Sequence, residues 1–144
     1  MEMVSFVADT LKRMHKTFFL VFAPGKGAYY PEYIPNSQKT QKGITNMEVY
    51  LKFAKEMQIP HIDFHSWFIQ QKHFSKYPLM PKYGIHWSQY GAMLVTDSIL
   101  KTIELKRGID IPDIYWKKLV IENAKDVDID IENGYFFPIG SALS

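Results

Sequence analysis

The segment Thr17-Phe-Phe-Leu-Val-Phe-Ala23 is a continuous, largely apolar run of β-prone residues, and Pro24-Gly25 ends it. A run of this kind, without alternating polar residues, is typical of a strand buried on both faces in a parallel sheet. Its wholly apolar part, Phe18 to Ala23, is far shorter than the ~20 apolar residues that span a bilayer, and shorter than a signal-peptide core of about 7–15 residues. We therefore expect a buried strand here, and neither a transmembrane segment nor a signal peptide in this chain.

Helical patterns flank this strand on both sides. Over residues 4–14, apolar side chains recur at three- and four-residue steps, which predicts a helix with one apolar face. Thr45-Asn-Met-Glu48 has the form of a capping box, a signature of a helix N-terminus. Ser88 is placed to cap a later helix that Gly108 would end. The chain therefore alternates between strand and helix patterns.

Further segments complete this alternation. His61-Ile-Asp-Phe64 is a strand candidate, a helix is expected over 66–73, and residues 118–121 are another strand candidate. Such an order predicts an α/β domain with a mostly parallel sheet and helices on both faces, a three-layer α/β/α sandwich. A length of 144 residues, with 47% hydrophobic and 22% charged residues, suits one domain over 1–144.

Composition excludes several classes of function. The chain has no cysteine, which rules out thiol nucleophiles and iron–sulfur clusters. Its net charge of +2 comes with no Lys/Arg cluster, so we expect no nucleic-acid partner.

Two short motifs also fail to match known ligand-binding loops. Gly25-Lys26-Gly27 lacks the full phosphate-loop pattern, which favours a tight turn over nucleotide binding. Residues 126–130 have the carboxylate spacing that opens a calcium loop, but the loop's glycine and final glutamate are missing.

A metal site is the remaining possibility at His61-x-Asp63-x-His65, where three potential ligands would share one face of a strand. Strand-end Asp–His pairs more often form structural hydrogen bonds, and no further acidic ligand has supporting spacing. We therefore expect no metal and no cofactor.

The segment Gly84-Ile-His-Trp-Ser88, followed by Tyr90-Gly-Ala92, is the sharpest chemical signal. His86 comes just before a helix cap, at a junction that would hold its imidazole rigidly beside the indole of Trp87. Such placement suits a general base, which must stay within hydrogen-bonding reach of a nucleophile. The alternative is structural, with a histidine that caps a turn and a tryptophan that fills the core.

Two segments together resemble SGNH hydrolase-like proteins of the alginate O-acetyltransferase type. Phe19-Leu-Val-Phe-Ala-Pro-Gly-Lys-Gly-Ala-Tyr-Tyr-Pro-Glu-Tyr-Ile-Pro35 is similar to that family's strand followed by P-x-K-x-x-x-Y-P-E-Y-x-P. Asp63, residues 77–82 and His86-Trp87-Ser88 repeat the family's order, and the resemblance covers residues 1 to about 132. It implies an SGNH/flavodoxin-like sandwich that handles acetyl esters of polysaccharides by a Ser-His-Asp mechanism, usually at the bacterial cell envelope or periplasm.

The resemblance also implies roles for individual residues. His86 matches the base that activates the serine. Lys26, Tyr30 and Trp87 match family positions, and we assign them to substrate binding. The family's Asp, two residues before the His, is replaced by Gly84, so we expect Asp63 to substitute for it as the second catalytic residue.

The nucleophile is the second departure from the family. In the family the nucleophilic serine lies in a Gly-Asp-Ser turn, and this chain contains no Gly-Asp-Ser. Gly140-Ser141, close to the terminus, is a weak partial match to it. Ser66 and Ser88 are better interpreted as helix caps. We therefore expect a partial, inactive domain, shortened from a longer protein at both ends.

These inferences give one expected site and its partners. We expect His86 and Asp63, together with Lys26, Tyr30 and Trp87, to line one cleft at the carboxyl edge of the sheet. The partner would be an acetylated polysaccharide or an acetyl donor, and an exposed sheet edge would favour self-association. A non-catalytic carbohydrate-binding domain that uses tyrosine and tryptophan faces, or a purely structural α/β domain, is the alternative.

Overall fold

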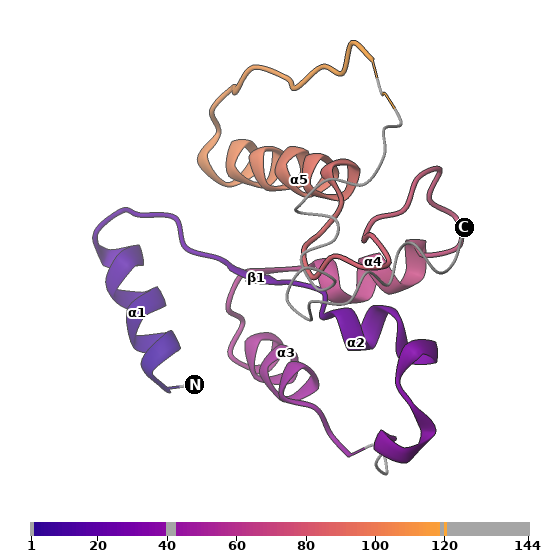
Figure 1. The fold of residues 1–144 in the computed structure, drawn as a ribbon. Coiled ribbons are helices and arrows are strands. Elements are labelled where there is room, and N and C mark those ends of the chain that lie inside the picture. Colours follow the sequence, from indigo (N-terminus) through magenta and orange to yellow (C-terminus); the bar gives the residue numbers. More distant parts are fainter. Residues whose placement is uncertain (1, 40–42, 119, 121–144) are drawn as a thin grey trace. The chain divides into compact units, whose positions relative to one another are not determined.

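The computed structural model describes residues 2–39, 43–118 and 120 of the chain (Figure 1). They belong to two compact units, Met1–Gln71 and Lys72–Ser144. The first unit contains α1 Glu2–Arg13, β1 Leu20–Phe22, α2 Lys26–Tyr29, α3 Asn46–Glu56, β2 His61–Asp63 and α4 Phe64–Gln71, with 3-10 turns at Pro31–Tyr33 and Asn36–Gln38. The second unit contains α5 Gln89–Arg107. The predicted mixed α/β class is confirmed.

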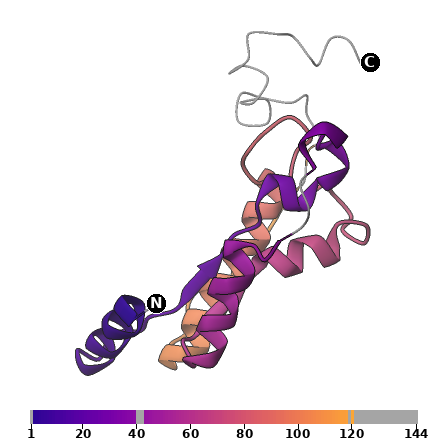
Figure 2. The ribbon, with the colours of Figure 1, turned by 90° about the horizontal axis from the view of Figure 1, so that it is seen from below.

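The strands β1 and β2 form a parallel pair in which Leu20 lies opposite His61 and Phe22 opposite Asp63. The N–H of Leu20 donates to the carbonyl oxygen of Pro60 at 2.9 Å. Parallel neighbours require a crossover connection, and α3 lies within it, as predicted. Both views place α1 and α2 at opposite ends of β1 (Figures 1 and 2).

The strands differ from the prediction in burial and in number. The prediction that β1 is buried on both faces is wrong, because Val21 is 41% exposed. In the described part of the chain, β1 has one neighbouring strand to shield it. Of the third predicted strand, residues 119 and 121 lie outside the described residues, while Lys118 and Val120 belong to no strand.

The helix α3 begins as its sequence predicts. The backbone N–H of Glu48 donates to the hydroxyl of Thr45 at 3.2 Å, and the N–H of Thr45 donates to the Glu48 carboxylate at 2.8 Å. These reciprocal bonds satisfy N–H groups that the first turn of a helix leaves without partners. Behind the cap, α3 buries Ala54 completely. Tyr29, Ile59, Phe64 and Phe68 are also buried in this unit.

The helix α4 begins earlier than predicted. It starts at Phe64, directly after β2, whereas the sequence indicated a start at Ser66. The carboxylate of Asp63 accepts a hydrogen bond from the N–H of Ser66 at 2.9 Å, which is the bond an N-cap side chain makes. The prediction that Ser66 caps this helix is therefore wrong, because Asp63 performs that role.

The helix α5 has the ends that the sequence predicts. The hydroxyl of Ser88 accepts from the N–H of Gly91 at 3.0 Å, and Gly108 adopts a left-handed conformation with φ of 62°. Its N–H donates to the carbonyl oxygen of Glu104 at 2.8 Å. A glycine ends a helix in this way because it lacks the Cβ that disfavours positive φ.

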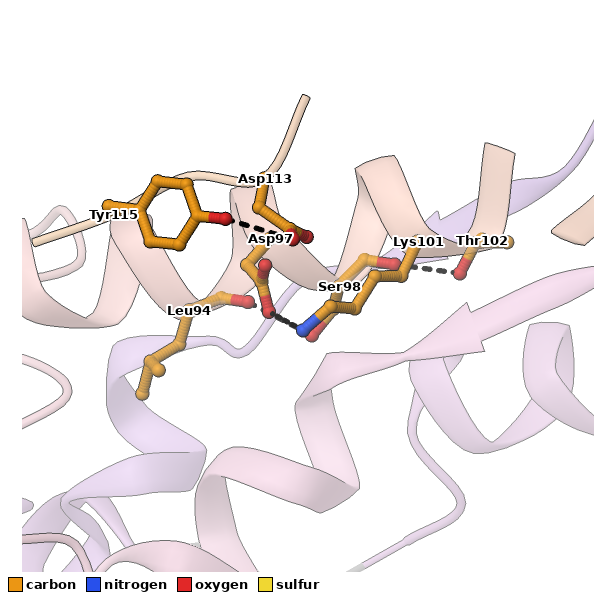
Figure 3. Close-up of polar contacts among 7 residues, drawn as sticks. All are labelled: Leu94, Asp97, Ser98, Lys101, Thr102, Asp113 and Tyr115. Atoms are coloured by element: carbon orange, nitrogen blue, oxygen red, sulfur yellow. Dashed lines mark hydrogen bonds and ion pairs between the residues drawn. The ribbon is translucent and has the colours of Figure 1, made fainter. Parts of the chain in front are cut away.

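Polar side chains on α5 bond mainly to the helix itself (Figure 3). Lys101 contacts the carboxylate of Asp97 at 2.7 Å, one turn away, and this pairing raises the pKa of Lys101. The hydroxyls of Ser98 and Thr102 donate to carbonyl oxygens one turn earlier, at 2.9 and 2.8 Å. The exposed pair of Lys101 and Asp97 adds little to stability.

Candidate functional site

Lys26 and Tyr30 lie where β1 gives way to the short helix α2. The ammonium group of Lys26 is 4.8 Å from the centroid of the Tyr30 ring, within the range of a cation–π interaction. Tyr29 is 3% exposed, and its ring packs edge-on against Tyr30 at 4.7 Å and against Phe68 at 6.3 Å. Tyr29 thus anchors α2 in the core. The structure also brings together Lys26 and Tyr30, two of the predicted substrate-binding residues.

Tyr30 is held in its neutral form. Burial, reinforced by Tyr29, Tyr33 and Glu32, raises the pKa of Tyr30 from 10.0 to about 12. A phenol that stays protonated can donate one hydrogen bond and accept others. The ring of Tyr33 lies 5.4 Å from that of Tyr30 and is 55% exposed. The loop after β1 therefore carries a cation, a neutral hydroxyl and a partly exposed aromatic ring.

Asp63 is the last residue of β2 and lies opposite Phe22 in the parallel pair. Because parallel strands end on the same edge of a sheet, Asp63 occupies the carboxyl edge after which Lys26 and Tyr30 follow β1. One oxygen of its carboxylate is bonded to the N–H of Ser66, which fixes its orientation. Asp63 therefore has an observed structural role, and its pairing with His86 stays a prediction.

The histidines near Asp63 do not form the alternating ligand set that a longer strand would give. The strand β2 ends at Asp63, and His65 lies on α4. The Nδ1 atom of His61 lies 2.8 Å from the carbonyl oxygen of Ile59; because a carbonyl only accepts, this nitrogen carries the proton. Within residues 2–39, 43–118 and 120, no three His, Asp or Glu side chains are placed to hold a metal ion.

The segment between Pro78 and Ser88 forms a loop whose two ends are joined. The Ser88 hydroxyl donates to the carbonyl oxygen of Pro78 at 2.6 Å, and the Ser88 N–H donates to that of Leu79 at 2.9 Å. Leu79 and Met80 are 0% and 1% exposed. The loop is therefore anchored at one end in the core and at the other end on the N-terminus of α5.

His86 and Trp87 lie at the second end of this loop, directly before the Ser88 cap. His86 is exposed and Trp87 is half-buried. Gly84, which stands where the family pattern has Asp, is buried. The structure thus places His86 and Trp87 directly before the hydrogen-bonded Ser88, and a rigid imidazole beside the indole stays a prediction. Since the two units are described separately, the cleft shared with Lys26, Tyr30 and Asp63 stays a prediction.

Gly91 is a residue whose importance sequence reasoning missed. A Cβ at this position would collide with the carbonyl oxygen of Leu79 and lie 3.2 Å from its carbonyl carbon. Only glycine lets the chain at Leu79 approach α5 this closely. The signal was present in Tyr90-Gly-Ala92, but its partner lies twelve residues earlier and no local pattern identifies it.

Residues 1–123 match the model of the family described as "SGNH hydrolase-like domain, acetyltransferase AlgX". The chain belongs to this family. The O-acetyltransferase domain of Pseudomonas putida AlgJ has a similar fold, with a TM-score of 0.53 and 18% sequence identity. The likeness covers 76% of this chain and 38% of that structure. No curated protein matches the sequence.

Membership of the SGNH hydrolase-like family confirms the resemblance found in the sequence and relates the chain to polysaccharide O-acetyltransferases. At 18% identity the likeness to the AlgJ domain shows the fold alone. The chain spans well under half of that structure, so the activity of the whole domain does not transfer directly. None of the described helices is long and apolar enough to cross a membrane. Ser141 and residues 126–130 lie outside the described residues.

Proposed function

We propose that this chain supplies the base and the substrate-contacting residues of a site that acts on acetyl esters of polysaccharides. His86 is the general base, and Asp63 takes the place of the missing orienting Asp. Lys26, Tyr30 and Trp87 contact the substrate. The observation that supports this most is the pinned loop, which holds His86-Trp87 at the N-terminus of α5 in a member of an acetyltransferase family.

The chemistry of these groups suits acyl transfer. The imidazole of His86 would take the proton of an attacking hydroxyl and return it to the leaving oxygen. The ammonium group of Lys26 and the neutral phenol of Tyr30 are donors for oxygen atoms of the substrate. The indole of Trp87 offers a flat apolar face for a sugar ring. Both directions of acetyl transfer use the same groups.

The 144 residues hold no Gly-Asp-Ser, so we propose that this chain has little or no turnover by itself. General acid–base assistance alone contributes about 10²–10⁴-fold. Covalent catalysis also needs an oxyanion hole, in which the loss of one donor costs about 10²–10³-fold in rate. In the α/β-hydrolase pattern, one such donor is the backbone N–H that follows the nucleophile.

Hydrolysis of p-nitrophenyl acetate tests the role of His86. We expect a slow rate for the unaltered chain and a lower rate for His86→Ala, with His15→Ala as a control for an imidazole outside the site. A rate that His86→Ala leaves unchanged would show that His86 is not the base. Fast turnover that depends on His86 would show that the chain is a complete enzyme.

The alternative is a carbohydrate-binding domain, for which the exposed Tyr33 ring beside Tyr30 is the supporting observation. Calorimetric titration with an O-acetylated polysaccharide separates the two functions. Binding that persists in His86→Ala and disappears in Trp87→Ala would favour the binding domain. Binding unaffected by either substitution, without any ester hydrolysis, would favour a structural role.

Two further proposals concern location and assembly. We propose a location at the bacterial cell envelope on the basis of the family, and cell fractionation tests it. We also propose self-association through the sheet, because β1 and β2 pair only with each other in the described part of the chain and unpaired strand edges recruit other chains. A strictly monomeric mass by light scattering at high concentration would contradict the second proposal.

A further inference from the structure

Ser88 does more than cap a helix. A capping side chain needs only to accept a hydrogen bond from the first turn, and the Ser88 hydroxyl does so from the N–H of Gly91 at 3.0 Å. The same hydroxyl also donates its proton to the carbonyl oxygen of Pro78 at 2.6 Å. The backbone N–H of Ser88 donates to the carbonyl oxygen of Leu79 at 2.9 Å. One residue thus joins both ends of the loop.

The cap of α3 shows that this second bond is not part of ordinary capping. Thr45 accepts from the N–H of Glu48, as Ser88 does from Gly91, but its hydroxyl bonds to the Glu48 carboxylate in its own first turn. The Ser88 hydroxyl instead reaches a carbonyl ten residues earlier in the chain. The donor function of Ser88 is therefore directed at the loop rather than at the helix.

The partner end of the loop is well fixed. Leu79 and Met80 are almost completely buried, and the carbonyl of Leu79 packs against Gly91 so closely that a methyl group there would collide with it. A loop held at one buried end and clamped at the other has few conformations left. His86 and Trp87 directly precede the end of the loop that Ser88 holds.

We propose that Ser88 is a positioning residue, whose hydroxyl bond to Pro78 holds the loop so that His86 and Trp87 keep one orientation before α5. The functional part of this inference rests on the proposed role of His86 as the base. Preorganisation of this kind matters because misplacing a catalytic group by about 1 Å can cost about 100-fold in rate. Ser88 itself contacts neither substrate nor nucleophile in this account.

Three substitutions separate the two bonds of the Ser88 hydroxyl. Ser88→Asp keeps an acceptor for the N–H of Gly91 but has no proton to donate to Pro78 at neutral pH. Ser88→Ala loses both bonds, and Ser88→Thr keeps both. Thr45→Ala is the matched control, because it removes a cap from α3 without touching the loop.

The measurement is backbone dynamics by ¹⁵N relaxation, combined with amide exchange, on the full 144-residue chain. We expect Ser88→Asp to lower the heteronuclear NOE over residues 82–87 and to speed exchange of the residue-88 amide about fivefold, the equivalent of one lost hydrogen bond. The helix α5 should remain protected. Ser88→Thr should restore the unaltered pattern, and Thr45→Ala should leave residues 82–87 unchanged. Unchanged dynamics of these residues in Ser88→Asp would overturn the proposal.

The same variants distinguish a failure of the proposed role of Ser88 in ordering the loop from a failure of the proposed function of His86. We expect Ser88→Asp to reduce the His86-dependent part of p-nitrophenyl acetate hydrolysis at saturating ester, with Ser88→Thr restoring it. If His86→Ala does not alter hydrolysis in the unaltered chain, the proposed function fails, while the relaxation data still decide whether Ser88 orders the loop. A mobile loop with full His86-dependent hydrolysis would overturn the positioning role.

Discussion

Replacing Gly91 with alanine perturbs the contact that anchors the His86 loop to α5. The added methyl group would collide with the carbonyl oxygen of Leu79 and lie 3.2 Å from the carbonyl carbon. Both atoms are backbone, and Leu79 is 0% exposed, so a side-chain rotation cannot relieve the collision. The Leu79 carbonyl also accepts the Ser88 N–H at 2.9 Å, and any shift of the carbonyl stretches that bond.

Opposing effects of Gly91→Ala decide how much the free energy of unfolding changes. Alanine forms helix better than glycine by about 1 kcal/mol. Against this, overpacking costs about 1–3 kcal/mol, and weakening the bond between Ser88 and Leu79 costs about 1 kcal/mol more. The unfavourable effects are larger. We therefore expect Gly91→Ala to lower the free energy of unfolding by about 1–3 kcal/mol.

Urea denaturation followed by circular dichroism measures this change, and amide exchange of Ser88 locates it. Gly27→Ala is the matched control, since Gly27 is also helical and its added methyl would meet only Ile34 Cδ1, at an ordinary 3.8 Å. That variant should be neutral or more stable by up to about 1 kcal/mol. The reasoning is refuted if Gly91→Ala is as stable as the unaltered chain with Ser88 exchange unchanged.

Other features of the structure give further predictions. Because the raised pKa of Tyr30, about 12, favours the neutral phenol, its contribution to stability is present below pH 10 and is lost as the pH rises towards 12. The ultraviolet titration of the chain minus that of Tyr30→Phe should therefore show a phenol still protonated near pH 11, and a midpoint near 10 would contradict this. Asp63→Ala should lower the free energy of unfolding by about 0.5–2 kcal/mol because α4 loses its cap, whereas Asp63→Asn should retain most of it; equal losses in a urea titration would show that capping is not its role. Thr45→Ala should cost about 1 kcal/mol through the capping box, and Thr45→Ser should restore stability in thermal melts; equal melting temperatures for all three chains would argue against the box.

Local rules explain why much of the fold could be predicted from the sequence. The capping box at Thr45 and the Ser88 cap each depend on residues three positions apart, and the Gly108 stop depends on one backbone conformation. The parallel pairing of β1 and β2 followed from an apolar run, a second short run and a helix between them. These local preferences agree with the overall fold, so the structure contains the elements that they predict.

The remaining features depend on neighbours that no local pattern reveals. The start of α4 was misplaced because Asp63, assigned to catalysis, takes the cap that Ser66 was expected to provide. The helix Lys26–Tyr29 is too short to show helical periodicity. The loop closure at Ser88 and the contact of Gly91 with Leu79 join residues nine or more positions apart. The sequence therefore proposes candidate site residues, whose shared site stays a prediction, but it does not reveal the contacts that support them.

Labelling with a fluorophosphonate probe, read out by mass spectrometry of the 144-residue chain, tests the central claim most directly. The claim is that this chain carries the base of an acetyl-ester site without an activated serine. We predict that the probe modifies no serine, in the unaltered chain or in His86→Ala. Stoichiometric labelling of Ser141, Ser88 or Ser66 that disappears in His86→Ala would contradict the claim, because it would show a complete catalytic triad.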